Sequence, residues 1–150
     1  MTLLANIGVL AGLIFLALEI RQSNRIAIAT AEMSIRDYYF AINELSATDV
    51  RMAELLARAR DANAQFTPTE VEQLDGYVFM NLNTWRAIEI AYSNGLLPQE
   101  TFESIESEAI GLLQEWPGLR PIMQGAADYS SEPDVRYSTQ ALRRALTIQE

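Results

Sequence analysis

The chain has 150 residues and a formal net charge of −9, from 20 acidic residues against 11 basic ones. This acidic balance argues against nucleic acid as a partner, because binding to phosphates requires a basic surface. The sequence contains no Cys, His or Lys, which excludes disulfides, thiol nucleophiles, Schiff-base lysines and imidazole metal ligands.

The first predicted element is an apolar helix at the start of the chain. Residues 2–18 carry no charge, and as a helix they span about 26 Å, close to the ~30 Å hydrocarbon core of a bilayer. We interpret residues 1–20 as a transmembrane anchor and residues 21–150 as one helical domain. Two other interpretations are open: a cleaved signal peptide, and the apolar core helix of a soluble bundle.

Basic residues around this helix predict its orientation. No Lys or Arg precedes the apolar run, whereas Arg21, Arg25 and Arg36 follow it. Positively charged residues close to a span favour the cytoplasmic side, and a signal peptide carries basic residues before its apolar run. The sequence therefore predicts a single-pass protein with its N-terminus outside and its C-terminal domain in the cytoplasm.

Two glycines in the predicted span are candidate contact residues. Gly8 and Gly12 form a G-x-x-x-G motif, which places both on one side of a helix and lets a second backbone approach closely in lipid. Such pairs also arise by chance, because glycine is frequent in membrane helices. We expect Gly8 and Gly12 to contribute to an interface with another helix.

The apolar helix is predicted to continue beyond the membrane, because residues 13–67 contain no Gly or Pro. Its continuation has one apolar face at Ile28, Ile35, Tyr39 and Ile42 and another at Ile26, Met33 and Phe40. Two apolar faces indicate that the helix is covered on more than one side, by its own domain or by a partner.

Three successive aromatic residues, Tyr38, Tyr39 and Phe40, follow on this helix. Three neighbours span too wide an arc to be buried in one core face, and large aromatic side chains are enriched in the cores of interfaces. We predict that these three residues form an interface. The alternative is that the bundle of the same chain wraps around the helix.

The next predicted element is a short helix after a break. Candidate N-cap residues at positions 46–49 are expected to end the long helix. The spacing of residues 50–59 predicts a helix with Val50, Ala53, Leu56 and Ala59 facing the core.

A capping box predicts the start of the clearest helix. Thr67 is the N-cap, Pro68 occupies the first helical position, and Glu70 follows three residues after the cap. This helix is predicted to end at Gly95, and its Tyr77 and Trp85 are expected in the core. Glu89, four residues after Trp85 on a mostly apolar face, is expected to pair with an arginine such as Arg86 or Arg120.

A second helix is predicted from Pro98 to Trp116, and the short connection between the two helices predicts an antiparallel hairpin. A short element over 119–127 and a last helix over 133–148 complete the chain. No segment alternates with a period of two. The predicted fold is therefore all-α, with an N-terminal transmembrane helix that continues into a small helical bundle containing this hairpin.

Three motifs resemble those of a known group of proteins. Residues 16–22 read L-x-x-E-I-R-Q, residues 92–97 read Y-x-x-G-L-L, and residues 117–120 read P-G-x-R. With these motifs the chain resembles a large group of small uncharacterised bacterial membrane proteins with one N-terminal span and a helical cytoplasmic domain. The resemblance implies a place in the bacterial inner (cytoplasmic) membrane, and it implies no activity.

Carboxylates are the remaining candidates for chemistry. Glu100, Glu103 and Glu106 lie on one face of the 98–116 helix with Glu108 nearby, and we interpret them as a solvated face opposite the apolar one. A di-iron bundle site requires Glu-x-x-His from two helices, which a chain without histidine does not have. We predict no catalytic residues, no metal site and no cofactor, and we expect that the protein is not an enzyme.

Three functions from different classes fit these observations. The favoured one is an assembly or accessory subunit that contacts the lipid bilayer and binds a second copy of itself or other membrane-protein subunits. The second is a membrane-anchored bundle that senses or carries a small apolar ligand in a cavity among Phe79, Trp85, Phe102 and Trp116. The third is a soluble helical regulator whose N-terminal helix belongs to its core.

Overall fold

The computed structural model describes residues 2–129 and 136–148. Within these ranges the chain forms six α-helices and one 3-10 turn, with no β-strand, so the all-α prediction is confirmed. The elements are α1 (Thr2–Thr48), α2 (Val50–Ala59), α3 (Pro68–Ser93), α4 (Gln99–Glu115), η1 (Pro117–Leu119), α5 (Arg120–Tyr129) and α6 (Tyr137–Ile148). The predicted start of the last helix at 133 lies outside the described residues.

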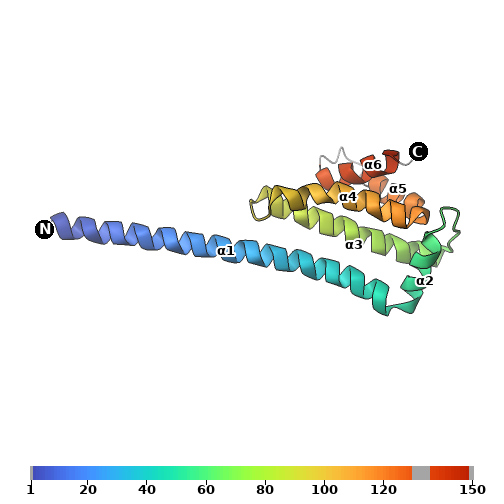
Figure 1. Ribbon diagram of the computed structural model, residues 1–150, viewed down its shortest axis with the longest axis horizontal. Helices are drawn as coiled ribbons and strands as arrows, with labels where there is room; N and C mark the ends of the chain where they lie inside the picture. Colours follow the sequence, from blue (N-terminus) through green and yellow to red (C-terminus); the bar gives the residue numbers. More distant parts are fainter. Residues whose placement is uncertain (1, 130–135, 149–150) are drawn as a thin grey trace.

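Helix α1 dominates the shape of the molecule. It is continuous over 47 residues, which corresponds to a length of about 70 Å. Its N-terminal half projects away from the rest of the chain, whereas its C-terminal half lies along the bundle (Figure 1). Among the described residues, it is the one helix that is long and apolar enough to cross a membrane.

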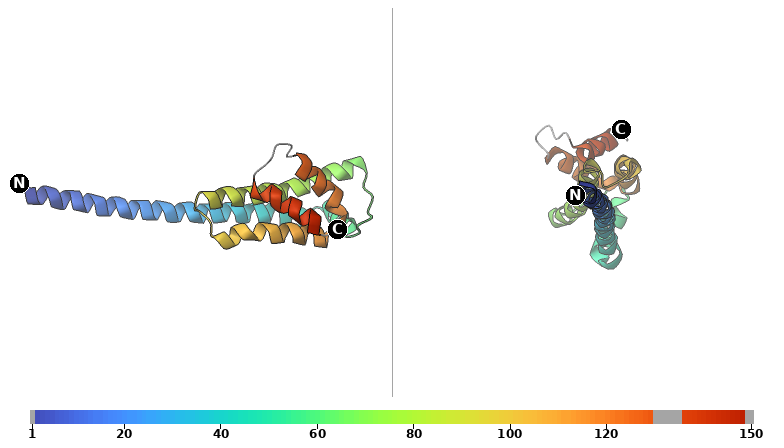
Figure 2. Two further views of the ribbon diagram at one scale, coloured as in Figure 1. Left: turned by 90° about the horizontal axis from the view of Figure 1, so that it is seen from above. Right: turned by 90° about the vertical axis from the view of Figure 1, so that its left-hand side faces the viewer.

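The C-terminal half of α1 packs along α3, and its Tyr39 also reaches α4. A seam at Ala27, Ala31, Ile35, Tyr39 and Ile42 is buried or half-buried. The spacing of four or three residues keeps these side chains on one face of the helix. Seen from above, α1 runs in the same direction as the two helices of the hairpin and beneath them (Figure 2, left).

Asp49 ends α1 and starts α2. Its carboxylate accepts hydrogen bonds from the backbone N–H groups of Arg51 and Met52, at 2.9 and 3.1 Å, as an N-cap residue does. The predicted inward face of α2 is wrong in part, because Val50 is 70 % exposed and Ala53 is also exposed. The buried side chains of α2 are Met52, Leu55, Leu56 and Ala59.

Helices α3 and α4 form the predicted antiparallel hairpin. At the start of α3, the Thr67 hydroxyl accepts from the Glu70 N–H, and the Glu70 carboxylate accepts from the Thr67 N–H, so the capping box is confirmed. At the end of α3, Gly95 has φ +70°, the left-handed conformation that glycine adopts at lowest cost. The Leu96 N–H then donates to the Ala91 carbonyl oxygen at 2.9 Å, which closes the helix end.

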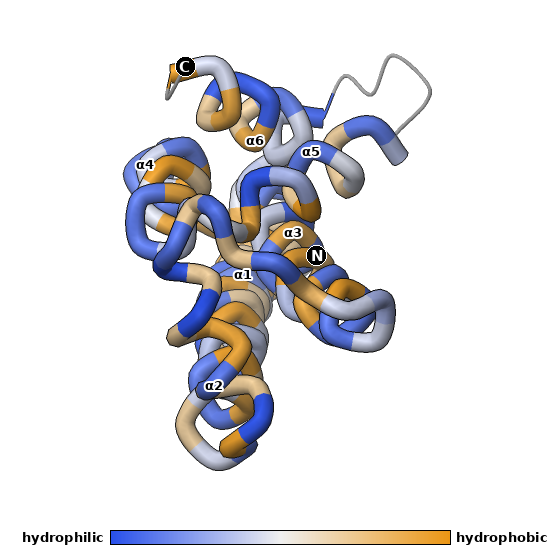
Figure 3. The backbone as a smooth tube through the Cα atoms, turned by 90° about the vertical axis from the view of Figure 1, so that its right-hand side faces the viewer, coloured by the Kyte–Doolittle hydropathy of each residue, from blue (hydrophilic) through white to orange (hydrophobic). Residues whose placement is uncertain are grey.

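The core of the bundle centres on α3. Trp85 is 2 % exposed, and Leu74, Leu82 and Ile88 are fully buried around it. Tyr77 meets the ring of Trp116 edge-on at 6.1 Å. Helices α4, α5 and α6 pack against α3. Viewed along the bundle, α2 and α6 lie at opposite ends of the molecule (Figure 3).

The turn η1 passes very close to the end of α2. A Cβ atom at Gly118 would lie 2.6 Å from the Asp61 carbonyl oxygen and 2.9 Å from that of Ala59. Real Cβ atoms do not approach carbonyl oxygens so closely, so this position requires glycine. This contact holds α2 against the α4–α5 corner.

Candidate functional site: the α1 helix and its contacts

The five predicted interface residues lie along α1. Gly8 and Gly12 are in its projecting half, where a Cβ atom at either position would meet no neighbouring atom within 4 Å. The three aromatic residues lie in the half that packs on the bundle, and each has a different environment. Tyr39 is half-buried, whereas Tyr38 and Phe40 are exposed. One helix thus presents both an intramolecular and an open surface.

Tyr39 connects α1 to the bundle through a shared carboxylate. Its hydroxyl donates to Glu108 Oε2 of α4, and Trp85 Nε1 of α3 donates to the same oxygen at 3.0 Å. Ser104 donates to Glu108 Oε1 at 2.9 Å. Burial, and after it the hydrogen bond to Glu108, raise the pKa of Tyr39 above its ordinary value. Three helices therefore meet at one acceptor.

We predicted that the glutamates of α4, including Glu108, form a solvated face, and for Glu108 this prediction is wrong. Glu100 and Glu103 are exposed, as expected, but Glu106 and Glu108 are half-buried and bound within the chain. A signal for Glu108 was present in the sequence, since it directly precedes Ala109 on the border of the apolar face. Its donors come from α1 and α3, which only the packing brings together.

Tyr38 lies on the flank of α1 beside α3. With Ala41 and Ile42 it lines a small open groove of about 240 Å³, and Met80, Asn83 and Thr84 of α3 line the other side. The Tyr38 ring therefore covers the edge of the α1–α3 contact and is not directed to the outer face.

Phe40 belongs to the outer face of α1, away from the bundle. Ile26 and Met33 lie on the same side of the helix and are exposed as well. The bundle side of α1 is occupied by Ile35 and Ile42, both buried. The two apolar faces that the sequence predicted are thus both present, and only one of them is covered by the chain itself.

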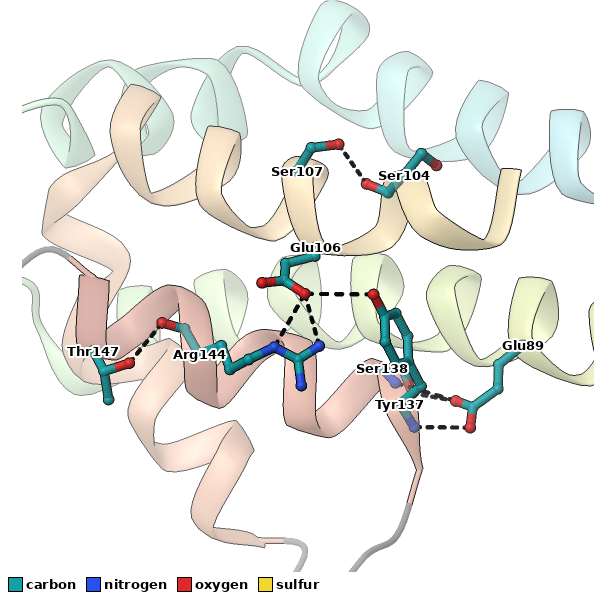
Figure 4. Close-up of polar contacts among 8 residues, drawn as sticks. All are labelled: Glu89, Ser104, Glu106, Ser107, Tyr137, Ser138, Arg144 and Thr147. Atoms are coloured by element: carbon teal, nitrogen blue, oxygen red, sulfur yellow. Dashed lines mark hydrogen bonds and ion pairs between the residues drawn. The ribbon is translucent and has the colours of Figure 1, made fainter. Parts of the chain in front are cut away.

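Two carboxylates hold the last helix in place (Figure 4). Glu89 of α3 accepts from the backbone N–H groups of Tyr137 and Ser138 and from the Ser138 hydroxyl, at 2.8, 3.2 and 2.9 Å. A carboxylate at the first turn of a helix satisfies free N–H groups and complements the helix dipole. The sequence predicted an arginine partner for Glu89, such as Arg86 or Arg120, and did not predict this cap, because Tyr137 is 48 residues away.

Glu106 of α4 forms the second contact with α6. Arg144 donates to it through Nε and a terminal nitrogen, at 3.0 and 2.7 Å, and lies over the Tyr137 ring at 5.1 Å. The hydrogen bonds from Arg144 hold the pKa of Glu106 below its ordinary value. Beside this pair the Tyr92 and Phe102 rings stack, and the Tyr137 ring packs against Phe102 at a tilt of 36°. The polar atoms of Glu106 and Arg144 thus bind each other and attach α6 to α4.

An open groove lies at the other end of α3, between the loop before this helix and α5. It has a volume of about 550 Å³ and is lined by Phe66, Phe79, Ile122 and Tyr129 together with Glu72 and Asp75. Burial, and after it the charge of Glu72, raise the pKa of Asp75. Of the four residues that we expected around a ligand cavity, Phe79 lines this groove, whereas Trp85 fills the core.

The described residues contain no group of three or more Asp or Glu side chains placed to hold a metal ion. The chain matches no protein-family model, no curated protein sequence and no solved structure. What the fold defines is an all-α protein with one candidate membrane-spanning helix that continues into a helical bundle.

Proposed function

We propose that the chain is a single-pass protein of the bacterial inner membrane, anchored by the N-terminal part of α1, with its bundle in the cytoplasm. In this proposal it acts as a non-catalytic assembly subunit. The observation that carries the proposal is the projecting half of α1. Nine large apolar side chains between Ile7 and Ile20 are more than half exposed there, and nothing in the described chain packs against them.

The energetics of this surface support a membrane as its environment. Leaving one large apolar side chain in water instead of burying it costs about 1.5–3 kcal/mol. A core helix of a soluble bundle would be mostly buried, which this half of α1 is not. A bilayer covers such a helix on all sides at once, and the helix satisfies its own backbone hydrogen bonds.

The continuity of α1 supports an anchor that stays attached. The apolar run and the bundle seam at Ile35 and Ile42 belong to one uninterrupted helix. The arginines at 21, 25 and 36 support a cytoplasmic position for the bundle. An assembly role is supported by the exposed apolar residues of the outer face beyond the span, because such surfaces commonly mark sites of association.

Membrane extraction and cysteine labelling test this proposal. The full-length chain should stay in the membrane pellet in alkaline carbonate, and release into the supernatant would refute the anchor. Because the chain has no cysteine, Asn63→Cys in the exposed α2–α3 loop supplies a unique thiol. A membrane-impermeant maleimide should label it only after spheroplasts are lysed. Labelling of intact spheroplasts would place the bundle outside and refute the orientation.

The groove beside Phe79 favours a second candidate function, the binding of a small apolar ligand. Its lining combines aromatic and aliphatic side chains with a few polar ones, as in many ligand sites. Native mass spectrometry of the detergent-solubilised chain would then show the added mass of a small molecule, and Phe79→Arg should remove it. Wild-type protein that carries only detergent and lipid would contradict this second function.

A further inference from the structure

The outer face of α1 carries a regular apolar stripe beyond the predicted span. Ile26, Met33 and Phe40 are 58, 63 and 65 % exposed and follow one another at intervals of seven residues. Seven residues fall only about 20° short of two full turns, so the three side chains share one face. The opposite face, with Ile35 and Ile42, is buried against the bundle.

We propose that a second copy of this chain packs in parallel along this stripe, so that residues 26–44 of two copies lie side by side as a helix pair. The proposal rests on the proposed function, because it takes the anchor of α1 as given. Residues seven apart drift by only about 20° per interval on a straight helix, so the stripe stays directed at one partner helix over this short length.

The anchor argues for a second copy with a parallel arrangement. Two copies inserted in the same orientation have their α1 helices side by side at the same depth, so each stripe residue meets its own counterpart. Confinement to one membrane also raises the effective concentration of the two chains relative to each other. The α3–α4 hairpin lies on the other side of α1 (Figure 2) and leaves this approach open.

The charges beside the stripe are complementary to themselves. At 100° per residue, Arg36 and Asp37 lie on the two opposite flanks of the line through Met33 and Phe40. A two-fold axis along the helix pair therefore places Arg36 of each copy beside Asp37 of the other. Neither side chain has an ion-pair partner among the described residues. An isologous contact satisfies both pairs at once.

The line of the stripe leads towards the membrane to Gly12, which lies two intervals of seven residues before Ile26. Glu19 lies between them and is charged, so the apolar stripe itself is confined to residues 26–40. The open space around Gly12 would let the partner backbone approach in the lipid.

Disulfide trapping in native membranes tests the proposal. Single-cysteine variants Ile26→Cys, Met33→Cys and Phe40→Cys probe the stripe, and Glu32→Cys and Ser34→Cys probe the exposed flanks of the same helix. A disulfide requires Cα atoms about 4.4–6.8 Å apart. We expect each of the three stripe variants to form a covalent dimer on mild oxidation, and the two flank variants to remain monomeric.

Three results would overturn the proposal. Absence of covalent dimer at all three stripe positions excludes the contact, and equal trapping at stripe and flank positions indicates random collision. Trapping at Met33→Cys alone indicates an antiparallel pair. If trapping fails while native mass spectrometry shows a particle larger than one chain, the assembly role survives with a different partner. If carbonate releases the chain, the proposed function itself fails.

Discussion

Replacing Glu108 with leucine should weaken the attachment of α1 to the bundle. The Glu108 carboxylate is the acceptor for the Tyr39 hydroxyl and for Trp85 Nε1. Trp85 is almost fully buried, so its N–H would find no water. An unsatisfied buried donor costs about 1–3 kcal/mol, and a lost hydrogen bond to a charged group costs about 1.5–3 kcal/mol. Together they lower the free energy of unfolding by about 2.5–6 kcal/mol.

Urea unfolding of the detergent-solubilised chain, followed by tryptophan fluorescence, measures this effect. Glu103→Leu is the matched control, because it makes the same change on the exposed side of α4 and should alter stability by less than about 0.5 kcal/mol. The pair Tyr39→Phe and Glu108→Gln should be coupled by about 0.5–3 kcal/mol in a double-mutant cycle. Equal urea midpoints for Glu108→Leu and Glu103→Leu would refute the shared-acceptor argument.

Three further predictions concern the ends and corners of the bundle. Thr67→Ala should lower the free energy of unfolding by about 0.5–2 kcal/mol through the lost cap of α3, with Thr67→Ser nearly unchanged; equal losses in both variants would argue against the cap. The bonds from Arg58, and after them those from Thr67, lower the pKa of Glu70 from 4.5 to about 2. Glu70 therefore contributes stability above pH 4.5 that is lost as the pH falls towards 2, and Glu70→Gln should flatten this part of a pH titration of the urea midpoint. Gly118→Ala should cost about 1–3 kcal/mol, as overpacking does, because its Cβ would collide with the end of α2. Gly111→Ala on α4, where the space is open, should be neutral or stabilising by up to about 1 kcal/mol; a thermal unfolding scan that ranks the two variants the other way would contradict this reading.

Local chemistry accounts for what the sequence by itself determined. The all-α class, the capping box at Thr67, the turn at Gly95 and the break near Asp49 were all predicted, because caps and left-handed glycines depend on residues within a few positions. The two apolar faces of α1 were also predicted, because periodicity along a helix is a property of one segment. The apolar helix in the projecting half of α1 was predicted as well, because a long uncharged run can be recognised without knowing its tertiary contacts.

Only the tertiary structure decided which face of each helix is covered and by what. In α2 the seam at Leu55 and Leu56 is buried and Val50 is exposed, because a short helix with several apolar residues has more than one possible inward face. The role of Glu108 depends on Tyr39, which is 69 residues away, and no local pattern carries such a distance. The three neighbouring aromatic residues show both kinds of information. The sequence alone shows that they cover an arc of about 200°, at 100° per residue. Only the position of α3 and α4 on one side of α1 directs Tyr39 inward, leaves Tyr38 at the edge of the contact, and exposes Phe40 on the outer face.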